Sequence, residues 1–395
     1  MLSTPYLVFA LTIVCSASID IYAAIAPDLA VALDVAPHWI KWSILLGPVA
    51  HCAVGIPVGF ISDRIGRRPL VLLGIVLYLL GSLSCAWSVH ITHFLLGRLL
   101  VSLAAGGLGV LCTAILADSF DGVELARWMA GYAALFVATF AIAPVVGAQL
   151  QELFSWRACF IFCFGAMAVI GLFVALLLTE TRLAPPDERR LALRSSLLAF
   201  LGQPRILLLA LVHALPGCLS ALFTTNAPFI YQHGFQFSPV QFSYLQAFPV
   251  GAQFFGAMLY KQIVPRIGLR RCFTLGLAST VTFILLGTMM LGTLLPKDPY
   301  LFVAILCVHC VGATFLTASS AAVMLSQQHT NKGLSVSIIG LLRNITLAAV
   351  IFSGSFLPHA GLFWILLLML GLSWLLLALT LVSLKHLPPA AARAA

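Results

Sequence analysis

Two side chains of opposite charge interrupt long apolar stretches of the sequence and could carry chemistry together. Asp20 lies in the apolar stretch 6–28, and Arg98 lies in the apolar stretch 93–116. A charge inside a bilayer costs roughly 3 kcal/mol even on lenient insertion scales, so it is by default a functional candidate. Counting about 1.5 Å per residue places Asp20 about 9 Å and Arg98 about 7–8 Å below the same outer membrane face.

The shared depth of Asp20 and Arg98 predicts a proton-coupling pair. If both face one cavity, they interact directly or through water. Burial favours the neutral carboxyl group, whereas a nearby guanidinium favours the carboxylate. Because opening and closing of the cavity changes both effects, Asp20 could take a proton from outside and release it inside. The alternative is a static ion pair, but apolar residues could replace such a pair at little cost.

Other polar residues near the middle of apolar stretches are candidates for a substrate cavity. An intramembrane arginine would suit an anionic or zwitterionic substrate, although bonding to helix carbonyls is an alternative. Histidines can relay protons near neutral pH, although a histidine satisfied by a neighbour is commoner. Amides and hydroxyls can line a pocket or simply join helices. The candidates are Tyr22, His51, Tyr132, His213, Asn226, Gln246, Gln253, His309 and Arg343.

The elements that hold these residues are long apolar segments. The chain of 395 residues is 62% hydrophobic and 8% charged, with a mean hydropathy of +1.08. A soluble domain carries about 25% charged residues, so the composition predicts an all-α membrane protein. A spanning helix needs roughly 20 apolar residues. The twelve predicted transmembrane helices cover residues 6–28, 41–61, 70–88, 93–116, 128–150, 157–179, 205–230, 239–261, 273–294, 300–325, 333–356 and 361–384.

Basic residues are distributed unevenly between the loops. With the N-terminus in the cytoplasm, inner loops and tails hold sixteen of the 21 Lys and Arg residues, outer loops three and helices two. This bias predicts a multi-pass protein with both termini cytoplasmic. The membrane that we expect is the bacterial inner membrane. The bias also accounts for the net charge of +9 without a nucleic-acid partner. Asp20 and the lack of a basic n-region indicate a retained first helix rather than a signal peptide.

A polar stretch at 180–204, with two adjacent prolines and mixed charge, divides the spans six and six. We predict an N-terminal six-helix bundle over 1–183, a cytoplasmic linker over 184–204 and a C-terminal six-helix bundle over 205–395. The linker could include a short surface helix at 187–200. A regulatory site there is an alternative to a plain connector.

The two halves carry traces of an internal repeat. SDRIGRRPL follows the second span and VPRIGLRRC follows the eighth, so residues 64–66 correspond to residues 266–268. Two parallel six-helix halves, pseudo-symmetric about an axis along the membrane normal, are a known transporter architecture. The repeat is unequal, because Pro265 stands where Asp63 would recur.

The loop GFISDRIGRRPLV at 59–71 is the most specific motif of the chain. Its pattern Gly-x-x-x-Asp-Arg-x-Gly-Arg-Arg resembles the signature loop of the major facilitator superfamily, and the twelve-span layout extends the resemblance over the whole chain. In that family, the loop's acid and arginines contact neighbouring helix ends and stabilise the outward-facing state. A purely topogenic basic loop is the alternative, but topology needs neither the acid nor the glycines. The implied gating residues are Gly59, Asp63, Arg64, Gly66, Arg67 and Arg68, with Asp118 as partner of Arg64 or Arg67.

The first span resembles that of the drug:proton antiporters of the Bcr/CflA and multidrug-antiporter branch. Ser18-Ile19-Asp20-Ile21-Tyr22 is followed by Pro27, and in this branch the acid binds protons and cationic drugs. Some relatives have a second acid two turns earlier, where this chain has Thr12. A mechanism with two carboxyl groups therefore does not follow from the resemblance.

The fourth and fifth spans add two weaker similarities. Arg98 resembles the intramembrane arginine of proton-coupled members, with Val101 and Ser102 in place of the usual glutamine and glycine. Pro144 and Gly147 match the Gly-Pro-x-x-Gly-Gly motif of antiporters, with alanine where glycine is usual. Small residues at these positions still allow close helix approach.

Together these patterns predict a proton-coupled secondary transporter that exports a small amphipathic drug or metabolite by alternating access of its halves. The alternative is a dedicated importer or exporter of an anionic metabolite such as a siderophore, which Arg98 and Arg343 would suit. An intramembrane enzyme or sensor is a third hypothesis, disfavoured by the intact loop and the missing catalytic cluster. We expect no ATP drive, because no phosphate-binding loop occurs, and neither cofactor nor metal. The expected partners are substrate, protons and lipid, for a monomer.

Overall fold

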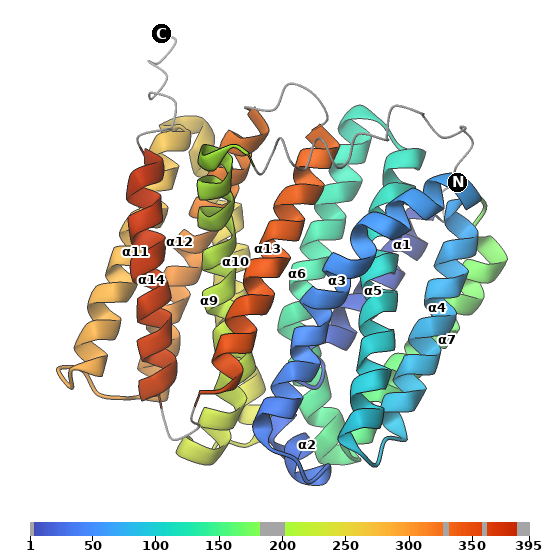
Figure 1. Cartoon of the computed structure of the whole chain (residues 1–395), viewed down its shortest axis with the longest axis horizontal. Helices are drawn as coiled ribbons and strands as arrows, with labels where there is room; N and C mark the ends of the chain where they lie inside the picture. Colours follow the sequence, from blue (N-terminus) through green and yellow to red (C-terminus); the bar gives the residue numbers. More distant parts are fainter. Residues whose placement is uncertain (1–3, 182–201, 327–331, 358–361, 385–395) are drawn as a thin grey trace. The chain divides into compact units, whose positions relative to one another are not determined.

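The computed structural model describes residues 4–181, 202–326, 332–357 and 362–384, which are almost entirely helical and contain no strand (Figure 1). The predicted surface helix at 187–200 lies outside the described residues, as does most of the predicted linker. The helices are α1 (Thr4–Asp20), α2 (Ala26–Ala32), α3 (Pro37–Ile65), α4 (Arg67–Ala86), α5 (Ile91–Ser119), α6 (Gly122–Leu153), α7 (Trp156–Leu177), α9 (Pro204–Phe235), α10 (Pro239–Ile267), α11 (Leu269–Leu291), α12 (Pro299–Ser326), α13 (Lys332–Ser355) and α14 (Phe363–Leu384).

The chain divides into two compact units. The first comprises Met1–Asp187 with Phe237–Tyr244, and the second comprises Glu188–Gln236 with Leu245–Ala395. In the first unit, α4 packs on α5 and α7, and α1 packs on α5, α6 and α7. In the second unit, α11 packs on α12 and α14, and α9 packs on α12, α13 and α14. The packing within each unit therefore follows the sequence repeat, with α1 equivalent to α9 and α4 equivalent to α11.

The apolar helices match the predicted membrane class. In the described part of the chain, nine helices are long and apolar enough to cross a membrane, or ten if the bent α3 is one span. The other two predicted spans coincide with α1, which has 17 residues, and with α10. The total of twelve spans stays a prediction.

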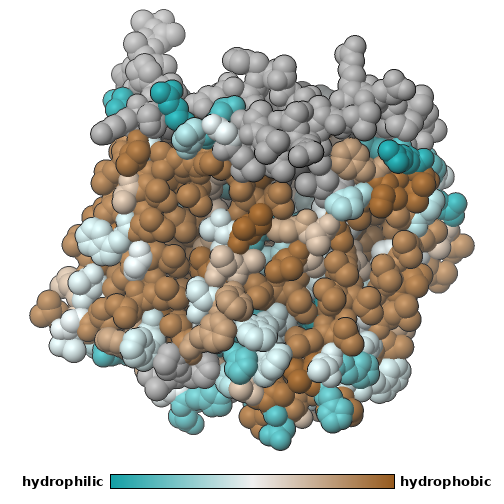
Figure 2. Space-filling view, in the orientation of Figure 1, coloured by the Kyte–Doolittle hydropathy of each residue, from teal (hydrophilic) through white to brown (hydrophobic). Residues whose placement is uncertain are grey.

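Hydrophobic residues cover most of the face seen in Figure 2. Large apolar side chains such as Leu96, Leu172 and Leu176 are exposed over 60–72% of their surface. In water such exposure would be unfavourable, whereas lipid tails solvate these side chains. The surface therefore suits a multi-pass membrane protein.

The first predicted span is not one continuous helix, and the single segment 6–28 was wrong in this respect. The chain leaves α1 after Asp20 and enters α2 at Ala26. Between them the amide of Ala23 bonds to the carbonyl of Asp20 at 2.9 Å, an i→i−3 bond. Pro27 explains the break, because proline has no N–H for the carbonyl of Ala23 and its ring clashes with that carbonyl in a regular helix.

Close contacts at glycines hold neighbouring helices together in both units. A Cβ atom on Gly81 of α4 would lie 2.8 Å from both the carbonyl oxygen of Gly97 and the amide nitrogen of Val101 on α5. A Cβ atom on Gly276 of α11 would lie 2.8 Å from the carbonyl oxygen of Gly312 on α12. The hydrophobic effect contributes little to helix association in lipid. Such close van der Waals packing therefore supplies much of the free energy that holds the helices together.

We expect Gly81→Ala to destabilise the first unit, since the new methyl group meets backbone atoms that cannot rotate away. The loss should be about 1–3 kcal/mol, measured as a lower thermal unfolding midpoint in detergent. Gly165→Ala on α7 is the matched control, because a Cβ atom there meets nothing within 4 Å. An unchanged midpoint for Gly81→Ala would contradict this close α4–α5 contact.

Candidate functional site

Asp20 lies at the point where α1 ends and the helix break begins. Its side chain is buried with 8% of the residue surface exposed. Among the described residues its carboxyl group makes no hydrogen bond and no ion pair. A buried carboxylate without donors is energetically unfavourable, whereas the protonated form tolerates such a place. This environment is suited to a carboxyl group that changes its protonation state.

Arg98 of α5 holds the backbone beside Asp20. Its side chain is 1% exposed, and its Nη1 donates to the carbonyl oxygen of Ser18 at 2.9 Å. A continuous helix would offer that carbonyl to the amide of Tyr22. The guanidinium also lies over the Tyr22 ring, 4.5 Å from its centroid, and the Tyr22 hydroxyl lies 2.9 Å from Ser43 Oγ on α3. Arg98 therefore bonds to the α1 backbone and not to the Asp20 carboxylate.

Gly147 brings α6 against the same helix break. A Cβ atom on Gly147 would overlap the carbonyl oxygen of Ile21. Pro144 lies one turn earlier, buried inside the continuous α6. The antiporter-like motif of α6 and the acid of α1 are thus parts of one place in the first unit. The sequence alone did not show that these two features lie together.

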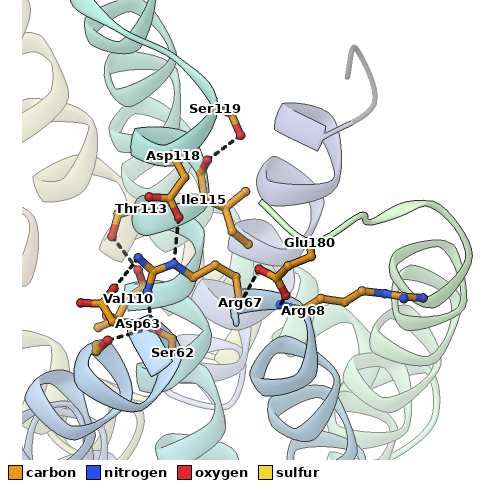
Figure 3. A network of polar contacts seen from close by, with 11 residues as sticks. Ser62, Asp63, Arg67, Arg68, Val110, Thr113, Ile115, Asp118, Ser119 and Glu180 are labelled. Atoms are coloured by element: carbon orange, nitrogen blue, oxygen red, sulfur yellow. Dashed lines mark hydrogen bonds and ion pairs between the residues drawn. The ribbon is translucent and has the colours of Figure 1, made fainter. Parts of the chain in front are cut away.

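The signature loop forms a dense polar cluster between helix ends (Figure 3). Arg67 Nη2 makes an ion pair with Asp63 Oδ1 at 2.7 Å, and Arg67 Nε donates to Asp118 Oδ2 at 2.9 Å. Arg67 also donates to Ser62 Oγ. Glu180 accepts hydrogen bonds from the Arg67 and Arg68 amides. We call the contacts among Ser62, Asp63, Arg67, Asp118 and Glu180 the loop network.

The loop network uses only some of the residues expected from the motif. Of the two arginines considered for Asp118, the structure brings Arg67 to it, while Arg64 is exposed. Gly66 has φ +99°, whereas Gly59 meets nothing within 4 Å of a Cβ atom. Sequence analysis missed Glu180. Its only signal was an acid directly after the sixth span, and nothing local showed where it docks.

The cavity candidates of the first unit are only partly brought together. A Cβ atom on Gly109 of α5 would lie 3.7 Å from both His51 Cε1 and the Tyr132 hydroxyl oxygen, so these two side chains flank the same stretch of α5. His51 is exposed and Tyr132 half-buried. Tyr22 is fully buried against Phe94 and Arg98 and offers no open surface in this structure.

The second unit has a neutral polar cluster around Gln253 of α10. Its Nε2 donates to Ser220 Oγ on α9 at 2.7 Å and to Cys310 Sγ on α12 at 3.7 Å. Sequence analysis proposed Gln253 but neither of its partners. Gln246 lies two turns earlier on α10 and is buried. Its Oε1 atom has no hydrogen-bond partner among the described residues.

The remaining candidates of the second unit are dispersed. Asn226 donates to the carbonyl of Leu222 on its own helix at 3.0 Å. His213 Nδ1 lies 3.0 Å from the carbonyl oxygen of Thr317. His309 is fully buried against the Phe283 ring, and neither ring nitrogen has a hydrogen-bond partner in the described part of the chain. The structure does not gather these three side chains into one cluster. Arg343 of α13 is exposed.

Comparison with known families shows the family of the chain. The model of the Major Facilitator Superfamily matches residues 8–342. The chain belongs to the major facilitator superfamily. It is accordingly a multi-pass membrane protein.

The similar proteins include curated multidrug resistance proteins and solved transporter structures that share the fold. The multidrug resistance protein MdtL of Salmonella paratyphi C is 33% identical over 188 residues, and MdtL of Klebsiella pneumoniae is 31% identical over 176 residues. These matches cover 46% and 44% of this chain and 47% and 44% of the relatives, so the chain spans about half the length of the curated relatives it matches. A solved D-xylose-proton symporter superposes with TM-score 0.77 at 13% identity, covering 99% of this chain and 98% of that one. A mutant of the nucleoside transporter NupG gives TM-score 0.74 at 13% identity, covering 96% of this chain and 99% of that one.

We expect Asp63→Asn to destabilise this superfamily member and to slow its transport cycle, because it removes the charge that faces Arg67. The loss of stability should be about 1.5–3 kcal/mol, measured by thermal unfolding in detergent. Pro265→Ala, at the equivalent position near the end of α10, is the control and should leave transport unchanged. If Asp63→Asn transports at the wild-type rate, the loop network has no part in cycling.

We expect Gly147→Ala to displace the helix break beside Asp20, because the methyl group would occupy the space of the Ile21 carbonyl oxygen. Thermal stability should fall by about 1–3 kcal/mol, and transport should fall with it. Gly217→Ala on α9, where a Cβ atom meets nothing within 4 Å, should be neutral in both assays. Equal behaviour of the two variants would contradict a tight α6 contact at the break.

Proposed function

We propose that the protein is a proton-coupled antiporter that exports a small amphipathic compound, a drug or a metabolite, across the bacterial inner membrane. The proposal includes cytoplasmic termini, a monomeric transporter and alternating access. Membership of the superfamily supports secondary transport, and the similarity to MdtL over half the chain favours drug-like substrates.

The observation that carries the proposal is the Asp20 carboxyl group at the helix break. It is buried, lacks hydrogen-bond donors among the described residues, and lies at the end of α1, where the regular helix is interrupted. In such a place the neutral carboxyl group is more stable than the carboxylate, so Asp20 keeps its proton until the site opens. Release of the proton then requires water or a cationic substrate to stabilise the carboxylate.

Arg98 contributes a fixed positive charge to the proposed proton coupling. Because its guanidinium is held by the Ser18 carbonyl and the Tyr22 ring, it stays in place whether Asp20 is charged or neutral. Its fixed positive charge favours the carboxylate form of Asp20. Small movements of the break change the distance between the two charges and so change the proton affinity. A ligand shifts such an equilibrium only through its different affinity for the two states.

The distribution of acids supports placing the proton site in the first half. Residues 202–395 contain a single acidic residue, Asp298, which precedes α12. In the second unit the polar cluster of Gln253, Ser220 and Cys310 is uncharged in its ordinary state. That cluster can orient a polar group of a substrate but cannot carry the proton cycle.

The second candidate function is transport of an anionic metabolite such as a siderophore. The exposed side chain of Arg343 on α13 favours it, because an exposed guanidinium within an apolar helix can bind a carboxylate or a similar group. Uptake measurements with substrate presented on each side would also decide between import and export. A growth screen against drugs and siderophores would supply the substrate for these assays.

We expect Asp20→Asn to abolish coupling while leaving the protein folded, because asparagine resembles the protonated acid in shape and charge. Everted vesicles loaded with a pH dye should show substrate-induced proton release for the wild type and none for the variant. Asp34→Asn is the control. Asp34 is an exposed acid in the turn before α3, and asparagine tolerates its φ of 50°. Proton release that persists in Asp20→Asn would overturn the assignment.

A further inference from the structure

Helix α4 begins without a cap from its own sequence. Its N-cap residue, Gly66, provides no side chain to accept a hydrogen bond from the helix start. The first amides of a helix lack intrahelical partners and carry a partial positive charge. Glu180 takes the place of the missing cap (Figure 3). One carboxylate oxygen accepts from the Arg67 amide at 2.8 Å, and the other accepts from the Arg68 amide at 3.0 Å.

Gly66 leaves the space that this carboxylate occupies. A Cβ atom on Gly66 would lie 2.5 Å from Glu180 Oε2 and 2.9 Å from Glu180 Cδ. Gly268, its counterpart in the sequence repeat, also has positive φ, at +80°, but a Cβ atom there meets nothing within 4 Å. Positive φ explains a glycine in both loops. Only position 66 also needs glycine for space, because the Glu180 carboxylate lies where a Cβ atom would be.

A second contact joins the same two helices. Arg68 Nη2 donates to the carbonyl oxygen of Ala175 on α7 at 2.8 Å. The start of α4 is therefore tied to the end of α7 both through its backbone and through a side chain. Arg67, whose backbone Glu180 holds, is the residue whose guanidinium joins Asp63 to Asp118.

We propose that Glu180 is a positioning residue of the loop network, which fixes the start of α4 so that Arg67 can reach Asp63 and Asp118 at once. The inference rests on the proposed gating role of the loop. Arg67 must place two nitrogen atoms against two carboxylates, and this is possible only from a narrow range of backbone positions. Without Glu180 the uncapped helix start frays, and the guanidinium loses one of its two partners. The second half has no equivalent, because no acidic residue follows Asp298 in the sequence.

Hydrogen–deuterium exchange of the full-length protein in nanodiscs tests the cap directly. In Glu180→Gln the amides of residues 67 and 68 should exchange roughly tenfold faster than in the wild type, because charge-assisted bonds hold them. Glu124→Gln, an exposed acid in the first turn of α6, is the matched control and should leave these amides unchanged. Unchanged exchange in Glu180→Gln overturns the proposal.

A pair of glycine variants separates docking from backbone strain. Gly66→Ala and Gly268→Ala impose the same unfavourable φ on alanine, but only the first collides with a carboxylate. Gly66→Ala should therefore speed exchange at residues 67 and 68 as Glu180→Gln does. Gly268→Ala should have no such effect on the start of its own helix, α11. Equal effects of the two variants at their helix starts would overturn the docking of Glu180.

A double-mutant cycle distinguishes positioning from simple stabilisation. Thermal unfolding of Arg67→Gln, Asp118→Asn and the double variant measures the coupling of this pair. The coupling should be present with Glu180 and lost in the Glu180→Gln background. If Glu180→Gln lowers the midpoint but leaves the coupling intact, Glu180 only stabilises α4 and the proposal fails. None of these measurements uses transport, so their failure is distinct from failure of the proposed antiport.

Discussion

A polar backbone group or a charge within a bilayer costs free energy unless it finds a partner inside the protein. This constraint governs the break between α1 and α2. Pro27 removes one helical hydrogen bond, and the chain before it makes i→i−3 hydrogen bonds instead of i→i−4 ones. Arg98 then donates to the Ser18 carbonyl, and within the described part of the chain the neighbouring Asp20 carboxyl group has no hydrogen-bond donor. A single arrangement thus stabilises the irregular backbone and leaves Asp20 able to bind a proton.

The same break explains why features of three spans belong together. The acid lies on α1, the arginine on α5 and the close glycine contact on α6. Each alone has a plain structural explanation, such as a buried polar residue or a small residue at a helix contact. Together they surround the helix break between α1 and α2, directly beside Asp20. Movement of α6 against this segment would change the environment of the acid.

The two halves share a fold but divide the charge unequally. Helices pack in the same order within each unit, and both loops of the repeat contain a glycine with positive φ. Yet eleven of the twelve acidic residues precede residue 189. The first half therefore contains the loop network and the candidate proton site, whereas the second contributes neutral hydrogen-bonding groups such as Gln253. Fold symmetry depends on apolar packing, which tolerates such divergence of the polar residues.

The class of the protein follows from its sequence alone. Apolar segments of about 20 residues, scarce charge and the signature loop can all be recognised locally in the sequence. Apolar segments of this length form helices that span a bilayer. The sequence also singled out Asp20, Arg98 and Asp63, because charged residues are rare in this apolar chain and a charge within a bilayer is costly. The sequence could not show which groups satisfy one another. That Arg98 bonds to Ser18, that Arg67 rather than Arg64 meets Asp118, and that Glu180 fills the space at Gly66 were decided by tertiary structure. These contacts join residues 51 to 114 positions apart, and only packing of the helices brings such distant groups within hydrogen-bond distance.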